Sequence, residues 1–257
     1  MSENSNNYLQ SLNKSQREAV ENNSGATLVL AGAGSGKTRV LTFKLLHLLA
    51  EKVLTPNQIL AVTFTNKAAS EMKSRVSKML NFPIDNMWLG TFHSLSLKIL
   101  RKNYETVGLK KNFIIIDTDD QLKLIKKICE QENIDTKEIS AKFFLNSIDH
   151  LKNKGVFYNE IKPNKYRRYD EELRKIYKIY QQELIRINCV DFGDLILLCI
   201  KLFNINDKVK KYYQNLFHFI LVDEYQDINF IQQKWLEHLY KGHRNICRSG
   251  SNLEIYL

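Results

Sequence analysis

The sequence predicts an α/β fold in which a parallel sheet carries an inserted, all-helical subdomain. Short apolar runs alternate with helical stretches along much of the chain, and a glycine-rich turn joins the first apolar run to the first long helical stretch. The alternation stops in the middle of the chain, where only helical spacing is found. Strand–helix alternation is typical of α/β sheets, so the purely helical stretch within it indicates an insertion.

Four apolar runs are rich in β-branched and large apolar side chains, which suit strands buried on both faces of a parallel sheet. The predicted strands are 26–31, 59–64, 87–92 and 219–223. Helical stretches follow them at about 37–52, 66–80, 93–106 and 228–241. This order gives four strand–helix units.

The segment from about 117 to 216 is predicted to be helical, with no strand. "DTDDQLKLIKKICEQ" opens with an Asp/Thr cap, and "YDEELRKIYKIYQQELIRIN" carries one apolar stripe at helical spacing. The predicted domains are a discontinuous sheet domain at 1–116 and 191–247, an inserted subdomain at 117–190, and an aberrant, patternless tail at 248–257. A folded insertion explains how Lys37 and Asp223, 186 residues apart, can come close.

Composition points to a protein of the cytoplasm with a polyanionic partner. The net charge is +10, and residues outside 117–190 carry +8 of it. Such an excess favours nucleic acid, although lysines also solvate helix faces. No long apolar run predicts a membrane span, and the polar N-terminus predicts no signal peptide. The four cysteines form no C-x-x-C pair, which predicts reduced thiols and neither a metal site nor a disulfide framework.

The segment "AGAGSGKT" fits the phosphate-binding P-loop pattern, with Ala31 where the strict form has glycine. Small residues let the backbone N–H groups point at phosphate oxygens, and the following helix adds its positive end. The predicted phosphate cradle is Ala31, Gly32, Ala33, Gly34, Ser35 and Gly36. Lys37 is predicted to reach the β- and γ-phosphates of ATP, and the Thr38 hydroxyl to bind Mg²⁺.

The segment "FILVDEYQD" supplies the second half of the predicted ATP site. An apolar strand that ends in Asp-Glu places Asp223 at the carboxyl end of the strand, where Mg²⁺ binds. Glu224 is then predicted to orient or deprotonate the attacking water. Asp-Glu after a strand is common in solvated turns, but together with the P-loop it predicts phosphoanhydride hydrolysis.

Six ordered segments resemble the motifs of UvrD/Rep/PcrA-type superfamily 1 DNA helicases. They are "LNKSQREAV", "AGAGSGKTRV", "AVTFTNKAASEM", "GTFHS", "DFGDLI" and "LVDEYQD". The resemblance covers residues 8 to about 247 and implies a RecA-like, ATP-binding motor domain with an inserted helical subdomain. It also implies ATP and Mg²⁺ as cofactors, single-stranded DNA and its junctions with duplex as partners, 3′→5′ translocation, and a role in DNA repair or replication restart.

The resemblance assigns roles around the nucleotide base and the DNA. Gln16 matches a glutamine that reads adenine, and Arg39 matches a residue that lies against the base. Phe64 matches an aromatic on which a base stacks. The DNA track implied by the family comprises Thr63, Phe64, Asn66, Thr91, Phe92 and His93. Gln226 and Asp227 are expected to couple the nucleotide state to the DNA grip.

Each of these residues also has an ordinary structural interpretation. Gln16 would otherwise be a surface side chain, and Arg39 would lie on a helix face. A phenylalanine beside a strand, such as Phe64, usually belongs to the core. A single histidine at a strand end, such as His93, is more often structural than functional.

The chain departs from the family pattern after Cys247. Helicases of this type continue into a motif of the form V-V-G-D-x-x-Q-S-I-Y-x-W-R-G, whereas this chain reads "RSGSNLEIYL". We therefore expect a monomeric front part of a helicase that binds Mg·ATP and single-stranded DNA but turns over slowly, since arginines of a second motor domain aid phosphoryl transfer. A frameshift, a split gene with a separately encoded C-terminal half, and deliberate shortening remain open as causes.

Three alternative functions remain open from the sequence. The chain could be a non-enzymatic module that binds nucleotide and DNA, including one subunit of a split gene. It could be an unrelated P-loop enzyme, such as a small-molecule kinase, although "GTFHS" and Phe64 would then be unexplained. It could also be the inactive product of a pseudogene.

Overall fold

The computed structural model describes residues 7–32, 34–80, 84, 86–163, 169–240 and 245–250. They form two compact units, which we describe separately. The first comprises Met1–Leu95, Asp207–Ile228 and Leu236–Leu257, and the second comprises Ser96–Asn206 and Asn229–Trp235. Among the described residues, no helix is both long enough and apolar enough to cross a membrane.

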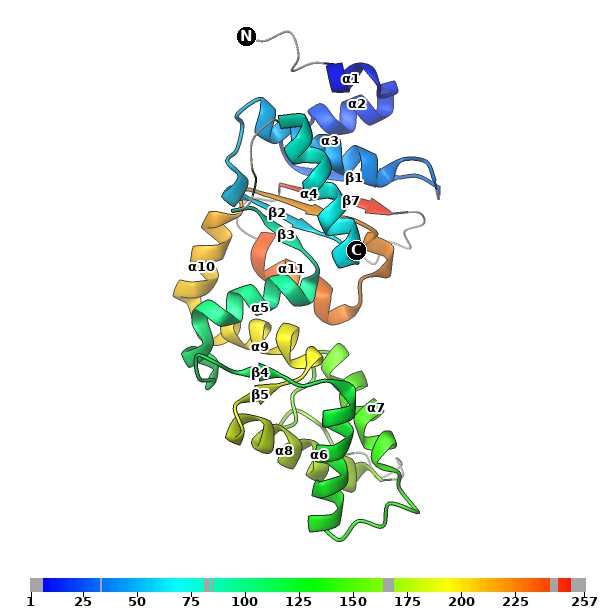
Figure 1. Cartoon of the computed structure of the whole chain (residues 1–257), viewed down its shortest axis with the longest axis vertical. Coiled ribbons are helices and arrows are strands. Elements are labelled where there is room, and N and C mark those ends of the chain that lie inside the picture. The colour runs from blue at the N-terminus through cyan, green and yellow to red at the C-terminus, as the bar shows by residue number, and fades with distance from the viewer. Residues whose placement is uncertain are drawn as a thin grey trace. The chain divides into compact units, whose positions relative to one another are not determined.

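The first unit is built on a parallel five-stranded sheet with the order β1-β7-β6-β2-β3 (Figure 1). The strands are β1 (Ala26–Leu30), β2 (Ile59–Val62), β3 (Trp88–Gly90), β6 (Phe219–Val222) and β7 (Ile246–Gly250). Four of them fall within the four predicted apolar runs, which confirms the predicted α/β fold with a parallel sheet. The central strands β2 and β6 are buried along their whole length, as both faces of a parallel sheet require.

Helices α3 (Lys37–Ala50) and α4 (Asn66–Leu80) cover one face of this sheet (Figure 1). Apolar side chains of α3 and α4 pack with alternate strand residues such as Ala61 and Leu221. Leu60 and Val222 point to the other face. On that face, Trp88 of β3 packs edge-on against Tyr213 and Phe217, at the end of α10 (Asp207–Leu216).

The remaining elements of the first unit are short or lie at its edges. They are α1 (Asn7–Gln10), α2 (Lys14–Glu21), η1 (Pro56–Gln58) and η3 (Tyr225–Asp227). Two helices, α5 (Phe92–Asn103) and α11 (Phe230–Tyr240), have residues in both units. Helices α3, α4, α5 and α11 begin within two residues of the predicted starts.

The second unit is a helical cluster with a two-stranded parallel pair. Its elements are η2 (Tyr104–Val107), β4 (Ile114–Ile115), α6 (Thr118–Gln131), α7 (Ala141–Asn153), α8 (Asp170–Arg186), β5 (Cys189–Val190) and α9 (Phe192–Ile205). The apolar stripes of α6, α7 and α8 meet in one core, which includes the predicted stripe residues Ile176, Tyr177, Tyr180 and Leu184. Asp117 caps α6 by accepting from the backbone N–H of Asp120, as the sequence predicted.

Two findings differ from the sequence expectations for this region. Strand β5 lies inside the segment expected to contain no strand, so that expectation was wrong; a strand of two residues is too short to show a period. Residues 96–116 and 191–206 also lie in the second unit, outside the predicted boundaries at 117 and 190. The reason is packing, because α9 lies against α7 and η2.

The first three residues assigned to the patternless tail belong to the sheet. Arg248, Ser249 and Gly250 extend β7, which pairs with β1 on one side and with β6 on the other. The guanidinium group of Arg248 lies over the rings of Tyr225 and Tyr240, with its Cζ at 4.5 and 5.5 Å from their centroids, which is a cation–π arrangement. Residues 251–257 lie outside the described residues.

Candidate functional site: a phosphate and metal site at the carboxyl edge of the sheet

The turn between β1 and α3 has the backbone that a phosphate loop requires. Gly34 and Gly36 have φ values of 75° and 89°, a left-handed conformation that favours glycine. The Ser35 side chain and backbone both donate to the Gly32 carbonyl, which closes the turn. Gly36 is the N-cap of α3, so the orphan N–H groups of this helix face the turn. Ala33 lies outside the described residues.

Lys37 is the first residue of α3, and its side chain is buried. Its Nζ donates to the carbonyl oxygens of Ala31 and Gly32 at 2.9 and 3.2 Å. The ammonium group therefore lies along the turn that the sequence assigned to phosphate binding. A cation and a row of backbone N–H groups at one helix N-terminus give a site for a polyphosphate.

Thr38 and Asp223 meet although 185 residues separate them. The Thr38 hydroxyl donates to Asp223 Oδ2 at 3.1 Å, and Asp223 directly follows β6. Hydroxyl and carboxylate oxygens are the hard ligands that Mg²⁺ prefers, and Mg²⁺ is commonly held by one or two protein groups together with phosphate oxygens. The two predicted metal ligands therefore fit the ion.

Two further donors hold the other oxygen of Asp223. The Ser249 hydroxyl donates to Asp223 Oδ1 at 2.6 Å, and the backbone N–H of Glu224 donates to the same oxygen at 3.1 Å. The carboxylate is thereby fixed with Oδ2 toward Thr38. The sequence analysis missed Ser249, because its position had been assigned to the patternless tail.

Glu224 follows Asp223 in a left-handed conformation with φ of 49°. Such a conformation is uncommon for a residue other than glycine, and it turns the chain sharply after the strand. The Gln226 side chain donates to Glu224 Oε2 at 2.7 Å and to Asp227 Oδ2 at 3.1 Å. Gln226 and Asp227 therefore form one hydrogen-bonded group with the predicted general base.

Gln16 lies beside the phosphate turn. It is the N3 residue of α2 and forms a reciprocal capping box with Asn13. Its Nε2 also donates to the Ser35 carbonyl at 3.4 Å. Gln16, Ala31, Ser35 and Lys37 all line one cavity of about 340 Å³, together with Leu28, Leu30 and other residues of β1 and α2. Arg39 instead donates to the Ser11 carbonyl and lies over the Phe43 ring.

The predicted DNA residues follow the carboxyl ends of β2 and β3, at the same edge of the sheet as Asp223. Phe64 is 55% exposed, which is unusual for an aromatic side chain that follows a buried strand. Asn66 is the first residue of α4 and is also exposed. Thr63 is buried, and its hydroxyl donates to the Thr65 carbonyl.

The "GTFHS" segment has a different arrangement. Thr91 directly precedes α5 and shares mutual hydrogen bonds with Ser94, and Gly90 leaves room for the Ser94 hydroxyl, which a Cβ there would meet at 2.5 Å. Phe92 is only 4% exposed, so its ring is a core side chain and not an open stacking face. His93 is half-buried, and this burial lowers its pKa.

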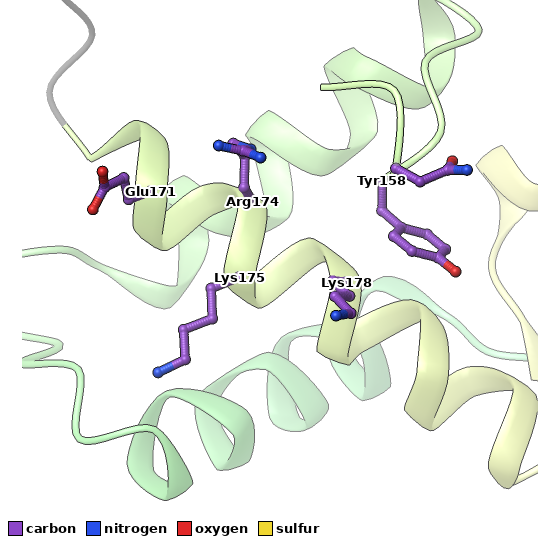
Figure 2. Close-up of a pocket in the computed structure, with 6 residues that line it drawn as sticks. Tyr158, Glu171, Arg174, Lys175 and Lys178 are labelled. Carbon is purple, nitrogen blue, oxygen red and sulfur yellow. The ribbon is translucent and has the colours of Figure 1, made fainter. Parts of the chain in front are cut away.

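A second cavity, of about 430 Å³, lies in the helical unit (Figure 2). It is lined by Tyr158, Asn159, Glu171, Arg174, Lys175 and Lys178. Lys175 forms an ion pair with Glu132 at 2.6 Å, and most of the charged side chains are exposed. It contains no predicted site residue, so its larger volume does not make it the functional site.

A parallel sheet that carries a P-loop after β1 and an Asp-Glu pair after β6, with β7 between these two strands, defines a P-loop NTPase domain. The profile of the UvrD/REP helicase N-terminal domain matches residues 12–252. The chain therefore belongs to the UvrD/REP helicase N-terminal domain family, as its motifs indicated.

Known relatives agree with this assignment. The chain is 43% identical over 253 residues to the ATP-dependent DNA helicase PcrA of Bacillus subtilis strain 168, covering 98% of this chain and 34% of that protein. It is 41% identical over 249 residues to PcrA of Staphylococcus aureus strain Mu50, covering 96% and 34%. PcrA of Staphylococcus epidermidis gives the same values. The chain thus spans about a third of the length of these relatives.

Proposed function

We propose that this chain is the ATP-binding motor part of an ATP-dependent DNA helicase that moves 3′→5′ along single-stranded DNA. The observation that carries the proposal is the meeting of Thr38 with Asp223 beside the P-loop lysine. Thr38 and Asp223 are 185 residues apart in the sequence, and the fold alone does not require the hydroxyl of one to meet the carboxylate of the other beside a phosphate turn. Relatives named as ATP-dependent DNA helicases extend the proposal from nucleotide to DNA.

Each residue of the site has a defined role in hydrolysis. Backbone N–H groups of the turn and Lys37 bind the β- and γ-phosphates and offset their charge. Thr38 and Asp223 would hold Mg²⁺, which would offset the negative charge of the phosphates during hydrolysis. Glu224 orients water toward the γ-phosphorus and accepts a proton as the new P–O bond forms and the bond to ADP breaks.

The DNA track is proposed to run over the exposed Phe64 and past Asn66 and Thr91. Stacking on an exposed aromatic ring is worth about 1–3 kcal/mol per base and accepts any sequence. The net charge of +10 favours binding to the phosphate backbone. His93 is proposed to contact the backbone as a neutral side chain. Junctions of single-stranded and duplex DNA are the proposed substrate of the longer helicase.

The setting is proposed to be the cytoplasm, in DNA repair or replication restart. The four cysteines are free and buried, which fits a reducing compartment. We propose a monomer that works with a second motor part, on the same chain or separately encoded. We propose that this assembly unwinds DNA, and that the present chain binds nucleotide and DNA.

The test is ATP hydrolysis and ATP binding by the purified chain, with and without single-stranded DNA. Lys37→Ala is expected to abolish both, whereas Lys78→Ala removes an equal charge from an exposed position on α4 and is expected to change neither. Binding that depends on Lys37 without turnover would fit a motor part that needs its second half. Turnover that DNA does not affect, together with no DNA binding, would favour the small-molecule kinase alternative and contradict the proposal.

A further inference from the structure

Lys44 is a fully buried cation in the first unit. It lies on α3, two turns after the phosphate loop, and its side chain is 0% exposed. Within the part of the chain that the structure describes, no ion pair joins it to an aspartate or glutamate. A buried ammonium group is costly unless its donors are satisfied, so its contacts indicate why it is there.

All three donors of Lys44 go to the end of one short helix. Nζ donates to the Val20 carbonyl at 2.9 Å, to the Asn22 carbonyl, and to Asn23 Oδ1 at 3.1 Å. Val20 lies in the last turn of α2, and Asn22 is its C-cap. The last carbonyls of a helix have no partner within the helix and carry its negative end, so an ammonium group from α3 satisfies them.

The opposite end of α2 carries the residue that faces the nucleotide cavity. Gln16 lies one turn before Val20, and it donates to the Ser35 carbonyl of the phosphate turn. Helix α2 has only eight residues, and helices this short are marginal in water without external contacts. Its position therefore depends on what holds each end.

Apolar packing alone leaves the orientation of α2 undetermined. Val20 packs into a cluster with Val40 and Leu46 of α3, and such contacts are non-directional. The hydrogen bonds of Lys44 are directional. Lys44 also lies over the Phe219 ring at 5.2 Å, which fixes its head group relative to β6, the strand that leads to Asp223.

We infer that Lys44 is a positioning residue for base recognition, which holds the end of α2 so that Gln16 stays over the nucleotide cavity. The inference rests on the proposed function, since it requires a nucleotide in that cavity. On this inference, the preference for adenine over other bases depends on Lys44, although Lys44 itself does not touch the base. Burial lowers the pKa of Lys44 to about 8, so the ammonium group is present at neutral pH.

The test separates binding of the base from binding of the phosphates. ATP, GTP and inorganic tripolyphosphate compete with a fluorescent ATP analogue on the full chain, in wild type and in Lys44→Met, Lys44→Arg and Gln16→Ala. Methionine keeps the length of the side chain but removes its donors. Loss of charge-assisted hydrogen bonds predicts an ATP affinity about tenfold lower in Lys44→Met, as in Gln16→Ala, with tripolyphosphate affinity changed less than about twofold. The ratio of ATP to GTP affinity is expected to fall by the same factor.

Conservative variants keep the inference testable if Lys44→Met does not fold. Lys44→Arg retains donors and is expected to keep most of the selectivity, and Asn23→Ala removes one acceptor and is expected to lower it partly. Equal losses of ATP and tripolyphosphate affinity would overturn the inference, because they indicate general damage. Unchanged selectivity in Lys44→Met would overturn it too. If wild type binds none of the three ligands, the proposed function fails and the inference fails with it; binding without base preference overturns only the inference.

Discussion

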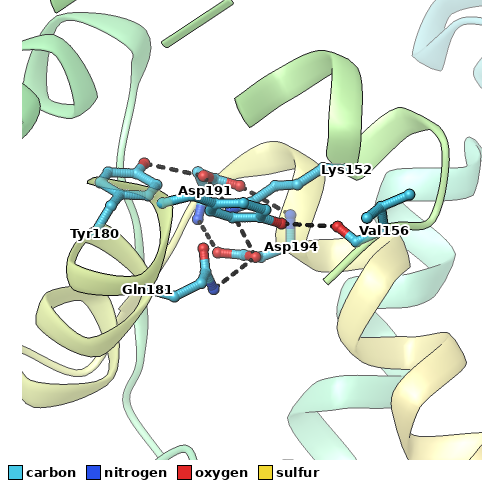
Figure 3. Close-up of polar contacts among 7 residues, drawn as sticks. Lys152, Val156, Tyr180, Gln181, Asp191 and Asp194 are labelled. Carbon is cyan, nitrogen blue, oxygen red and sulfur yellow. Dashed lines mark hydrogen bonds and ion pairs between the residues drawn. The ribbon is translucent and has the colours of Figure 1, made fainter. Parts of the chain in front are cut away.

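Replacing Lys152 by methionine is expected to destabilise the helical unit strongly, because it removes the ammonium group that pairs with two buried carboxylates. Lys152 Nζ lies 2.6 Å from Asp191 Oδ2 and 2.7 Å from Asp194 Oδ1, and all three side chains are at most 1% exposed (Figure 3). Tyr180 donates to Asp191, and Gln181 donates to Asp194. These hydrogen bonds would remain in the variant, so the change isolates the ammonium group.

The magnitude follows from the state of the two carboxylates. Burial and the neighbouring Asp191 raise the pKa of Asp194 to about 6, although Lys152 opposes the shift. Without Lys152 two acidic groups would share a dry site, and one of them would take up a proton. Breaking a buried pair by removing one partner costs about 3–5 kcal/mol, a large part of the 5–15 kcal/mol typical of a domain. We expect a loss in this range at pH 7.

Urea unfolding measures this loss of stability. Trp235 is a suitable probe, since it is buried in the helical unit and its indole N–H donates to Cys199 Sγ. Lys154→Met is the matched control, two residues along the chain and exposed. The double variant Lys152→Met with Asp194→Asn removes one of the two acidic groups that would otherwise share the site without a cation, and it is expected to recover part of the stability. A loss below about 1 kcal/mol for Lys152→Met, equal to that of the control, would refute the reasoning.

Two further predictions concern acid stability and the DNA track. Burial, followed by the positive charge of Lys44, lowers the pKa of His47, which shares a hydrogen bond with Tyr8. The unfolded chain then binds more protons than the folded one near and below pH 6.5. The contribution of His47 to the free energy of unfolding is expected to be fully present above pH 6.5 and to be lost below it, by at most about 1.4 kcal/mol per pH unit. In His47→Gln the free energy of unfolding is expected to depend less on pH in this range. The same pH dependence in the variant and in wild type would contradict this prediction. Phe64→Ala is expected to weaken single-stranded DNA binding by about 1–3 kcal/mol with little loss of stability, as measured by fluorescence anisotropy. Phe92 is buried, so Phe92→Ala is expected instead to lower stability by about 3–5 kcal/mol. If Phe92→Ala weakened DNA binding and Phe64→Ala lowered stability, Phe92 would be the stacking residue and Phe64 the core residue.

The parts of the structure that were predicted are those specified by short continuous stretches of sequence. Strands β1, β2, β3 and β6 are apolar runs, and each run was enough to identify a strand of the parallel sheet. The expected burial on both faces was wrong for β1, which lies at the edge of the sheet and leaves Leu28 and Leu30 40% and 55% exposed. The phosphate turn is likewise local, since the left-handed backbone at Gly34 and Gly36 favours glycine at both positions. The meeting of Thr38 with Asp223 followed from these two local features and one rule, that ligands bind at the carboxyl ends of parallel strands.

The elements that were missed depend on partners distant in the sequence. Strand β7 contains Arg248 and Ser249, which interrupt the apolar run expected of a central strand. Arg248 is accommodated by two tyrosine rings, and Ser249 is accommodated by Asp223. Neither partner can be identified from the five residues of the strand. Strand β5 was missed for a simpler reason, because two residues cannot display a period of two.

Two fully buried lysines, Lys44 and Lys152, show the same limit most clearly. Lysine is almost never fully buried unless it is paired, so a sequence pattern assigns each lysine to the surface by default. Lys44 and Lys152 are both 0% exposed, yet their acceptors differ: helix carbonyls for the first and two carboxylates for the second. A weak signal existed for Lys152, since Gly193 in "DFGDLI" leaves room for its side chain, and a Cβ there would meet Lys152 Cδ at 2.9 Å. No such signal existed for Lys44, because two of its three acceptors are backbone carbonyls that any sequence forming α2 would present, and the third is the side chain of Asn23, an ordinary residue after a helix end.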